Sequence, residues 1–214
     1  GYVKDQDWHE FKIYIPDVIP EKHLRIAEIV KKKYGLKVLK FKKRKDIQPY
    51  ARKVFETLNA SFAPLYGFAE LTPKQIDYYV RIYIPMLRLN LITLIVREED
   101  DTVVGFGISL PSLSHALQKA KGRLFPFGFI PLLKAMHSKT KIVDLYLMGI
   151  LPEYQNKGVN ALLFCDLIPE YIKLGAEYAE SNIELETNTA VQAQWDYFKR
   201  EHHKTRRVFI KKLI

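Results

Sequence analysis

Two β-rich runs around an acidic turn restrict the folds that this chain can adopt. "LITLIVRE" (Leu91–Glu98) and "TVVGFGISL" (Thr102–Leu110) are apolar and β-branched, and "EDD" lies between them. This pattern predicts a β-hairpin. Segments with helical spacing precede and follow it, so the sequence predicts an alternation of helices and strands.

The remaining elements follow from periodicity and from helix start and stop signals. Gly35 should end the first helix, and Asp46 and Thr72-Pro73 should begin the next two. The segment 113–141 interrupts the pattern with an apolar insertion. Helices are predicted over 20–35, 46–62, 73–87, 158–175 and 188–200, and further strands over 11–19, 36–41, 141–151, 178–187 and 204–213.

Composition excludes several classes of protein. The chain has 214 residues, of which 48% are hydrophobic, so it can bury a core. One cysteine cannot form an internal disulfide, which favours a reducing, cytoplasmic location. Pro126 and Pro131 break the longest apolar stretch, so no transmembrane segment is predicted. The histidines lack metal-ligand spacing, so no metal is predicted either.

The net charge of +10 is concentrated in Lys31–Lys45 and near the C-terminus. Such charge attracts phosphates on nucleic acid, on an anionic membrane or on a nucleotide-like cofactor. It is more typical of a solvated helix face followed by a strand with outward lysines, which we take as the first interpretation. No zinc-finger spacing or RNA-binding signature accompanies the charge, so a nucleic-acid-binding module is a secondary hypothesis.

The turn in "MGILPEYQNKGVNALLFCDLI" (Met148–Ile168) joins a predicted strand to a predicted helix. A helix N-terminus presents unpaired N–H groups and a partial positive charge. Gly158 would let a phosphate approach these amides, and Lys157 would add a mobile positive charge. The turn is therefore either a phosphate-binding loop or a structural connection.

The strand, the proline, "YQNKG" and the helix resemble the acetyl-CoA-binding motif of the GCN5-related N-acetyltransferases, Gln/Arg-x-x-Gly-x-Gly/Ala. Gln155 and Gly158 match, but Asn160 occupies the last small position and Ala161 comes one residue later. The order of elements also agrees, and the resemblance covers roughly residues 36–214.

The resemblance implies an α/β (α+β) fold with a mixed, largely antiparallel central sheet and flanking helices, in which the strands separate into a V. It implies acetyl-CoA or another acyl-CoA as cosubstrate and an amine as acceptor. It assigns the pantetheine arm to the backbone of Met148, Gly149 and Ile150, and the diphosphate to the amides of Gln155, Asn156, Lys157, Gly158, Val159, Asn160 and Ala161.

Catalytic groups are harder to assign. Members of the family often have a tyrosine on the last helix, seven residues after an Asn, that acts as the general acid. Asn188 is present, but Trp195 occupies the Tyr position and is predicted to pack in the core. Asp144, Tyr146, Glu184 and Glu186 are candidate bases, and Asp144 and Tyr146 are ranked first because they share a predicted strand face with Met148. We assign Asp144, Tyr146 and Asn188 as the candidate catalytic residues, whereas Cys165 should be a packed thiol.

Three functions are therefore compatible with the sequence. The first is an acyl-CoA-dependent N-acyltransferase. The second is a degenerate domain of the same fold that binds a ligand or partner. The third is the basic nucleic-acid-binding module.

The domain prediction separates residues 1–35, the expected tail of a related upstream half, from an acyltransferase-like domain over 36–214. A homo-oligomer is also possible. The insertion 113–141 covers the core, forms a lid over an apolar acceptor or a longer acyl chain, or makes a protein contact.

Overall fold

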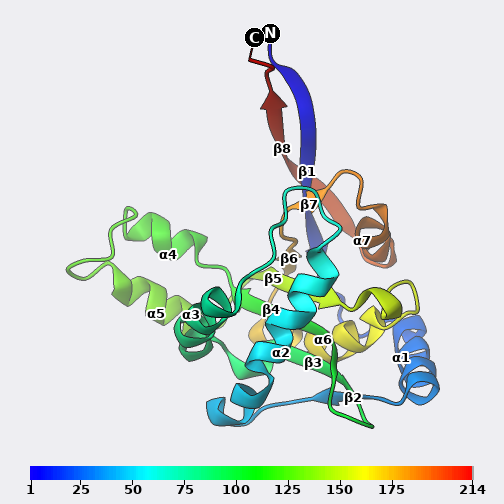
Figure 1. The fold of residues 1–214 in the computed structure, drawn as a ribbon. Coiled ribbons are helices and arrows are strands. Elements are labelled where there is room, and N and C mark those ends of the chain that lie inside the picture. Colours follow the sequence, from blue (N-terminus) through cyan, green and yellow to red (C-terminus); the bar gives the residue numbers. More distant parts are fainter. Residues whose placement is uncertain (214) are drawn as a thin grey trace.

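The computed structural model describes residues 1–213 and has helices on both faces of a mixed sheet (Figure 1). The strand order is β2-β3-β4-β5-β6-β1-β7, with β8 also paired to β1. Only β5 and β6 pair in parallel, so the sheet is largely antiparallel, as expected. The strands are β1 (Val3–Tyr14), β2 (Leu36–Leu39), β3 (Ile92–Arg97), β4 (Val103–Pro111), β5 (Ile142–Ile150), β6 (Tyr178–Glu180), β7 (Glu184–Leu185) and β8 (Arg200–Ile210).

The helices form two layers. α2 packs on one face of β3 and β4, while α1 and α6 pack on the other. The α-helices are α1 (Glu21–Tyr34), α2 (Arg44–Phe62), α3 (Pro73–Tyr83), α4 (Ser114–Lys119), α5 (Phe129–His137), α6 (Asn160–Leu174) and α7 (Thr189–Ala193). Short 3-10 turns are η1 (Ile84–Met86), η2 (Leu89–Leu91), η3 (Pro152–Tyr154) and η4 (Gln194–Tyr197).

Strand β3 explains why both layers are needed. Ile92 and Leu94 are fully buried in the α2-side cluster, and Ile95 is fully buried in the α1–α6 cluster. Side chains alternate between the two faces of a strand. If helices covered only one face of the sheet, the apolar side chains on the other face would be exposed to water. The uninterrupted apolar run in the sequence therefore reflects burial on both faces.

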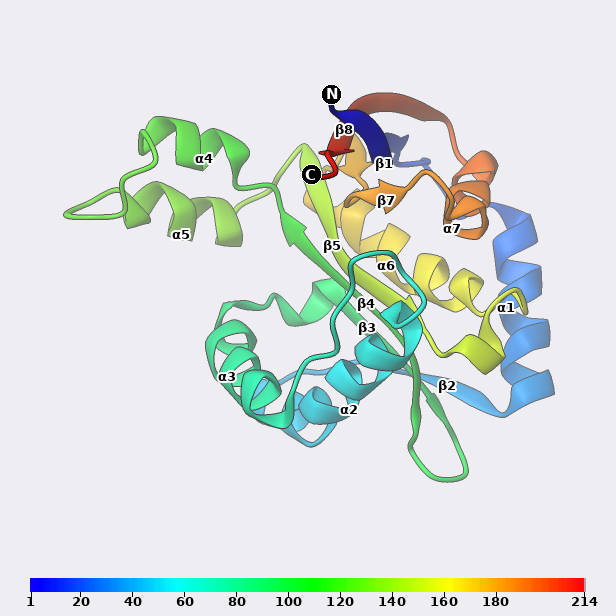
Figure 2. The same cartoon turned by 45° about the horizontal axis from the view of Figure 1, so that its top comes forward.

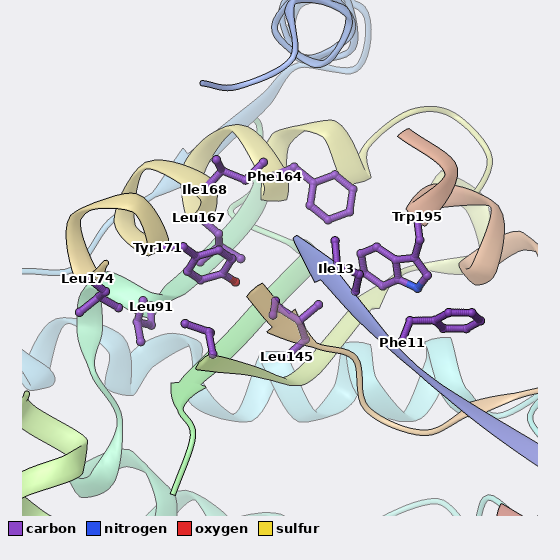
Figure 3. Close-up of a cluster of buried hydrophobic side chains, with 12 residues drawn as sticks. Phe11, Ile13, Leu91, Leu145, Phe164, Leu167, Ile168, Tyr171, Leu174 and Trp195 are labelled. Carbon is purple, nitrogen blue, oxygen red and sulfur yellow. The ribbon is translucent and has the colours of Figure 1, made fainter. Parts of the chain in front are cut away.

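A third cluster joins α6 to the opposite half of the sheet (Figure 3). Phe11 of β1 and Leu145 of β5 contribute from the sheet, and Phe164 contributes from α6. Trp195 of η4 closes the cluster and is only 3% exposed. Its predicted burial is confirmed.

Several predicted boundaries are wrong. The expected strand over 178–187 is broken into β6 and β7, and the last helix is shortened to α7 and η4. Asp46 does not begin α2; it lies inside the first turn, where its carboxylate accepts a hydrogen bond from the Lys43 amide. Thr72 does cap α3, and its capping partner is Gln75.

Strand β1 lies between β6 and β8, and its N-terminal part extends with β8 as a two-stranded ribbon away from the helices (Figure 1). Residues 1–19 thus contribute a strand to the common sheet. The interpretation of residues 1–35 as the tail of an upstream domain stays a prediction.

The insertion 113–141 forms α4 and α5, which project from the body of the molecule (Figure 2). Phe125 is 81% exposed and Phe127 is 71% exposed. The core-cover interpretation is therefore wrong for most of the insertion. Met136 of α5 is buried, but neither phenylalanine borders Tyr146 as the lid interpretation required.

Candidate functional site

A β-bulge in β5 opens the centre of the sheet. Ile108 of β4 pairs with Leu147, and the next residue, Ser109, pairs with Leu145, so Tyr146 has no opposite residue. The parallel pairing of β5 with β6 ends at Asp144 and Glu180. Bulges bend strands and often lie beside active sites. The two strands separate beyond this point, as the resemblance implied.

The bulge shifts the alternation of side chains along β5. Leu145 packs in the α6-side cluster and Leu147 against the α2-side cluster, but Met148 again packs on the α6 side. The prediction that Met148 shares a face with Asp144 and Tyr146 is therefore wrong. A single inserted residue reverses every later position of a strand.

A groove of about 340 Å³, here called the cofactor groove, follows the free edge of β5. α2 and α7 contribute its other walls. Among the residues assigned to the cofactor, Met148, Gly149, Ile150, Gln155, Asn156, Gly158, Val159 and Asn160 line this groove. Ala161 instead lines an adjoining depression, and Lys157 lies between the rings of Tyr34 and Tyr154.

The free edge of β5 leaves one residue with open backbone groups. Asn182 Nδ2 donates to the Tyr146 carbonyl oxygen at 2.9 Å, and Gln155 Nε2 donates to the Ile150 carbonyl oxygen at 3.0 Å. Alternate residues of a strand direct backbone groups to the same edge, so Met148 faces this edge between them. Within residues 1–213, no side chain bonds to the Met148 backbone. Its N–H and C=O can therefore pair with an extended ligand.

The loop before α6 presents a run of free amides. Gln155 and Ala161 use their N–H groups within the turn, at 3.2 Å to the Pro152 oxygen and 3.0 Å to the Gly158 oxygen. In the described part of the chain, the N–H groups from Asn156 to Asn160 meet no acceptor. Successive free amides at a helix N-terminus form an anion-binding site. This site is shorter by one residue at each end than the assigned range.

The glycines of the site have different roles. Gly158 has a positive φ of 78°, and a Cβ there would lie 2.8 Å from Ile26 of α1, so a larger residue would disturb helix packing as well as the loop. Gly158 is therefore needed for helix packing, and its role in keeping room for a phosphate stays a prediction. A Cβ at Gly149 would lie 2.7 Å from both the Phe106 ring and Ser61 Oγ.

A second cavity of about 580 Å³, here called the reaction chamber, adjoins the cofactor groove. Met148, Asn188 and Val191 line both, and Glu184 lines the chamber. Burial raises the pKa of Glu184 to about 7, against a hydrogen bond that lowers it. The donor is Trp195 Nε1, which lies 2.7 Å from Glu184 Oε1. Glu184 Oε2 is buried without a partner in the described structure.

This arrangement changes the ranking of the candidate bases. Asp144 lines neither the groove nor the chamber; burial and the nearby Glu180 raise its pKa to about 6. Tyr146 lines the chamber, and burial and Tyr83 raise its pKa, so it stays protonated at neutral pH. Asn188 Oδ1 accepts from the Val191 amide and caps α7. Burial raises the pKa of Cys165 to about 11, which keeps it a thiol.

The candidate bases taken from the sequence included Glu184, but Asp144 and Tyr146 were ranked ahead of it. The available signal was Trp195, whose indole N–H needs a partner when it is buried. Gln194 was not considered; it lines both cavities and accepts a hydrogen bond from Asn160 Nδ2 at 3.4 Å.

Two negative findings apply to residues 1–213. No group of histidine, cysteine or acidic side chains is arranged to hold a metal ion. No helix is both long enough and apolar enough to cross a bilayer.

A substitution in the groove wall tests whether an anion binds there. Ala190 is exposed on α7 and lines the groove, so Ala190→Glu places a negative charge beside the free amides without disturbing the core. Binding of acetyl-CoA should weaken about tenfold or more, which calorimetry would detect. The control is Thr189→Glu. Thr189 precedes Ala190 in the sequence, and its side chain is exposed but does not line the groove. Equal weakening by both variants would contradict the assignment.

Comparisons with curated proteins give distant relatives, and no family model matches the chain. The "Bacterial ceramide synthase" of Caulobacter vibrioides is 26% identical over 221 residues, which cover 100% of this chain and 56% of that protein. "Protein YghO" of Escherichia coli is 28% identical over 123 residues, or 55% of this chain and 32% of that protein. The chain thus spans about half the length of the first relative and less of the second.

Solved structures resemble nearly the whole chain. A GCN5-related N-acetyltransferase from Sphaerobacter thermophilus has a TM-score of 0.57 at 11% identity, with 98% of this chain and 52% of that one covered. A GCN5-related glucosamine N-acetyltransferase region of a fungal multi-domain beta-N-acetylglucosaminidase has a TM-score of 0.59 at 10% identity, covering 98% of this chain and 21% of that one. The chain therefore has the fold of the GCN5-related N-acetyltransferases, which is an acyltransferase fold.

Proposed function

We propose that the protein transfers an acyl group from acyl-coenzyme A to the nitrogen of an amine. The observation that carries this proposal is the continuity of the cofactor groove with the reaction chamber. The groove offers free amides for a diphosphate and the open Met148 C=O for a pantetheine arm, and the chamber holds a buried carboxyl group with a pKa of about 7. A group with a pKa near the working pH is suited to general base catalysis.

The reaction forms a C–N bond and breaks the C–S bond of the thioester. The Glu184 carboxylate accepts the proton that the amine loses, and the protonated carboxyl can return a proton to the departing thiolate. The Met148 N–H donates to the carbonyl oxygen as negative charge develops on it. Trp195 positions Glu184 through its indole N–H. This role explains why a tryptophan at the family's tyrosine position does not by itself favour a degenerate domain.

Trp195→Phe tests this positioning role. Phenylalanine keeps most of the packing but removes the donor, so the pKa of Glu184 should rise further above 7. The pH at which kcat/KM is half-maximal should move up by about one unit, with activity recovered at high pH. An unchanged pH profile would contradict the role of Trp195.

The name of the Caulobacter vibrioides relative guides the choice of amines to test as acceptors. Ceramide is an N-acylated lipid amine, so the panel of amines should include long-chain amines beside amino acids and polyamines. Acetyl-CoA is the shortest donor in the proposal. The lone thiol of Cys165 is compatible with the cytoplasmic location that we retain as part of the proposal.

The experiment follows the release of free thiol from acyl-CoA and identifies the amide by mass spectrometry. We expect thiol release that depends on the added amine and yields one amide per thiol. Acyl-CoA binding without amide formation across the panel would favour the degenerate binding domain.

A further inference from the structure

An apolar cavity of about 490 Å³ lies between α2, α3 and one face of the sheet. Aliphatic side chains form most of its wall, and no described charged residue lines it; Ile47, Val54, Leu58, Ile92, Leu94 and Ile108 are representative. Protein interiors contain few voids larger than a water molecule, whereas ligand sites have volumes of this size and lining. The cavity is therefore suited to an apolar ligand.

The apolar cavity meets the reaction chamber beside β5. Tyr146, Leu147 and Asn182 line both. Along β5, Ile150 and Met148 border the cofactor groove, and the next residues, Leu147 and Tyr146, border the apolar cavity. An acyl group attached to a pantetheine arm beside Met148 would therefore lie next to this cavity.

We propose that the apolar cavity binds the aliphatic chain of the acyl donor, so that the preferred donor carries a medium or long acyl chain. This inference rests on the proposed acyl-CoA function and specifies its donor. The amine would then enter the reaction chamber from the side of Glu184.

Binding of octanoyl-CoA and acetyl-CoA to the whole chain tests this inference. Each buried methylene strengthens binding by about fourfold at most, so the ceiling for the six extra methylenes of octanoyl-CoA is about 4,000-fold. Allowing for incomplete burial, we expect octanoyl-CoA to bind at least about 100-fold more tightly than acetyl-CoA. Ala51 lines the cavity, and Ala51→Phe should remove most of this gain while leaving acetyl-CoA binding unchanged. Ala60→Phe is the control, because Ala60 lies exposed on the same helix. Met86→Trp, at a half-exposed lining residue, replaces Ala51→Phe if that variant does not fold.

The outcomes separate this inference from the proposed function. Equal affinity for both donors would overturn the chain site and leave the acyl-CoA function intact. A dependence on the chain length of the amine alone would also overturn it. Failure of both donors to bind a folded protein would overturn the proposed function as well.

A separate observation concerns the helical hairpin Ser114–His137, here called the α4–α5 hairpin. It projects from the body (Figure 2). Apolar side chains on it are exposed to solvent. They are Leu117, Leu124, Phe125, Phe127, Phe129, Ile130 and Leu133. Lys119, Lys121, Arg123 and Lys134 accompany them, and no acidic residue occurs from Ser112 to Val143.

We also propose that the α4–α5 hairpin binds the surface of an anionic lipid bilayer. Aromatic side chains that enter the interface and lysines that meet anionic headgroups are the two components of peripheral membrane binding. Leu113 and Met136, at the base of the hairpin, line the apolar cavity. The hairpin would therefore hold the cavity close to the bilayer.

Co-sedimentation with vesicles tests the membrane proposal. Vesicles containing phosphatidylglycerol should bind the protein, and pure phosphatidylcholine vesicles should bind it at least tenfold more weakly. Phe125→Ser with Phe127→Ser, and separately Lys121→Glu with Arg123→Glu, should each lower binding to anionic vesicles tenfold or more. Val18→Ser is a control at an exposed apolar residue elsewhere. No binding to either vesicle, or equal binding by all variants, would overturn the proposal.

Discussion

Replacing Glu184 by Gln is expected to lower kcat/KM for acyl transfer by about 10²- to 10⁴-fold, the usual contribution of a general base. Glutamine keeps the acceptor for Trp195 Nε1 but cannot take a proton. The acyl-transfer activity proposed for the unmutated protein should increase as pH rises through about 7, where Glu184 ionises. The rate of thiol release with a productive amine measures both effects. Glu186→Gln is the matched control, because Glu186 follows on the same segment and lines neither cavity.

The pH dependence of the free energy of unfolding provides an independent measure of the pKa of Glu184. The pKa of Glu184 rises from 4.5 in the unfolded chain to about 7 in the folded one, so the folded state binds a proton more tightly. The protonated group stabilises the fold below pH 4.5, and this contribution is lost as pH rises through 7. Glu184→Gln should therefore be more stable relative to the unmutated protein at pH 8 than at pH 5, by on the order of 3 kcal/mol at most. An equal difference at both pH values would contradict the raised pKa.

Gly149→Ala should destabilise the fold and weaken acyl-CoA binding together. The new methyl group would lie 2.7 Å from the ring of Phe106, which is fully buried and cannot move aside, and from Ser61 Oγ in the groove wall. Overpacking of this kind costs about 1–3 kcal/mol. Chemical denaturation and calorimetry measure the two effects.

Gly105→Ala is the control for Gly149→Ala. Gly105 lies on the neighbouring strand, and its nearest contacts to a Cβ would be 3.3 Å, so small shifts can accommodate the methyl group. It should cost less stability and should leave binding unchanged. If Gly105→Ala weakens binding as much, the narrow space at Gly149 is not what shapes the groove.

The sequence predicted the elements that depend on local patterns. The hairpin around Asp100, the helix after Gly158 and the capping of α3 by Thr72 are confirmed, because periodicity and capping are local properties. The bulge at Tyr146 was not predictable in this way, since it depends on how β5 pairs with Ile108 and Ser109 of β4, which lie far away in the sequence. Missing it placed Met148 on the wrong face.

The burial of polar side chains was the second feature that local sequence patterns did not predict. Glu184 was one of four candidate bases from the sequence, but the predicted strand is interrupted between β6 and β7, and the Glu184 carboxylate accepts a hydrogen bond from buried Trp195. The sequence indicated that Trp195 would be buried, yet not which acceptor its N–H would find. The exposure of Phe125 and Phe127 was missed for the opposite reason, because apolar composition alone indicated a packed segment.

Calorimetric titration of the unmutated protein with acetyl-CoA tests the central claim most directly. The free amides from Asn156 to Asn160 and the open edge at Met148 predict saturable binding at one site per chain, weakened by Ala190→Glu and not by Thr189→Glu. If a folded sample gives no heat of binding at millimolar acetyl-CoA, the loop before α6 is only a structural turn and the acyltransferase account is wrong.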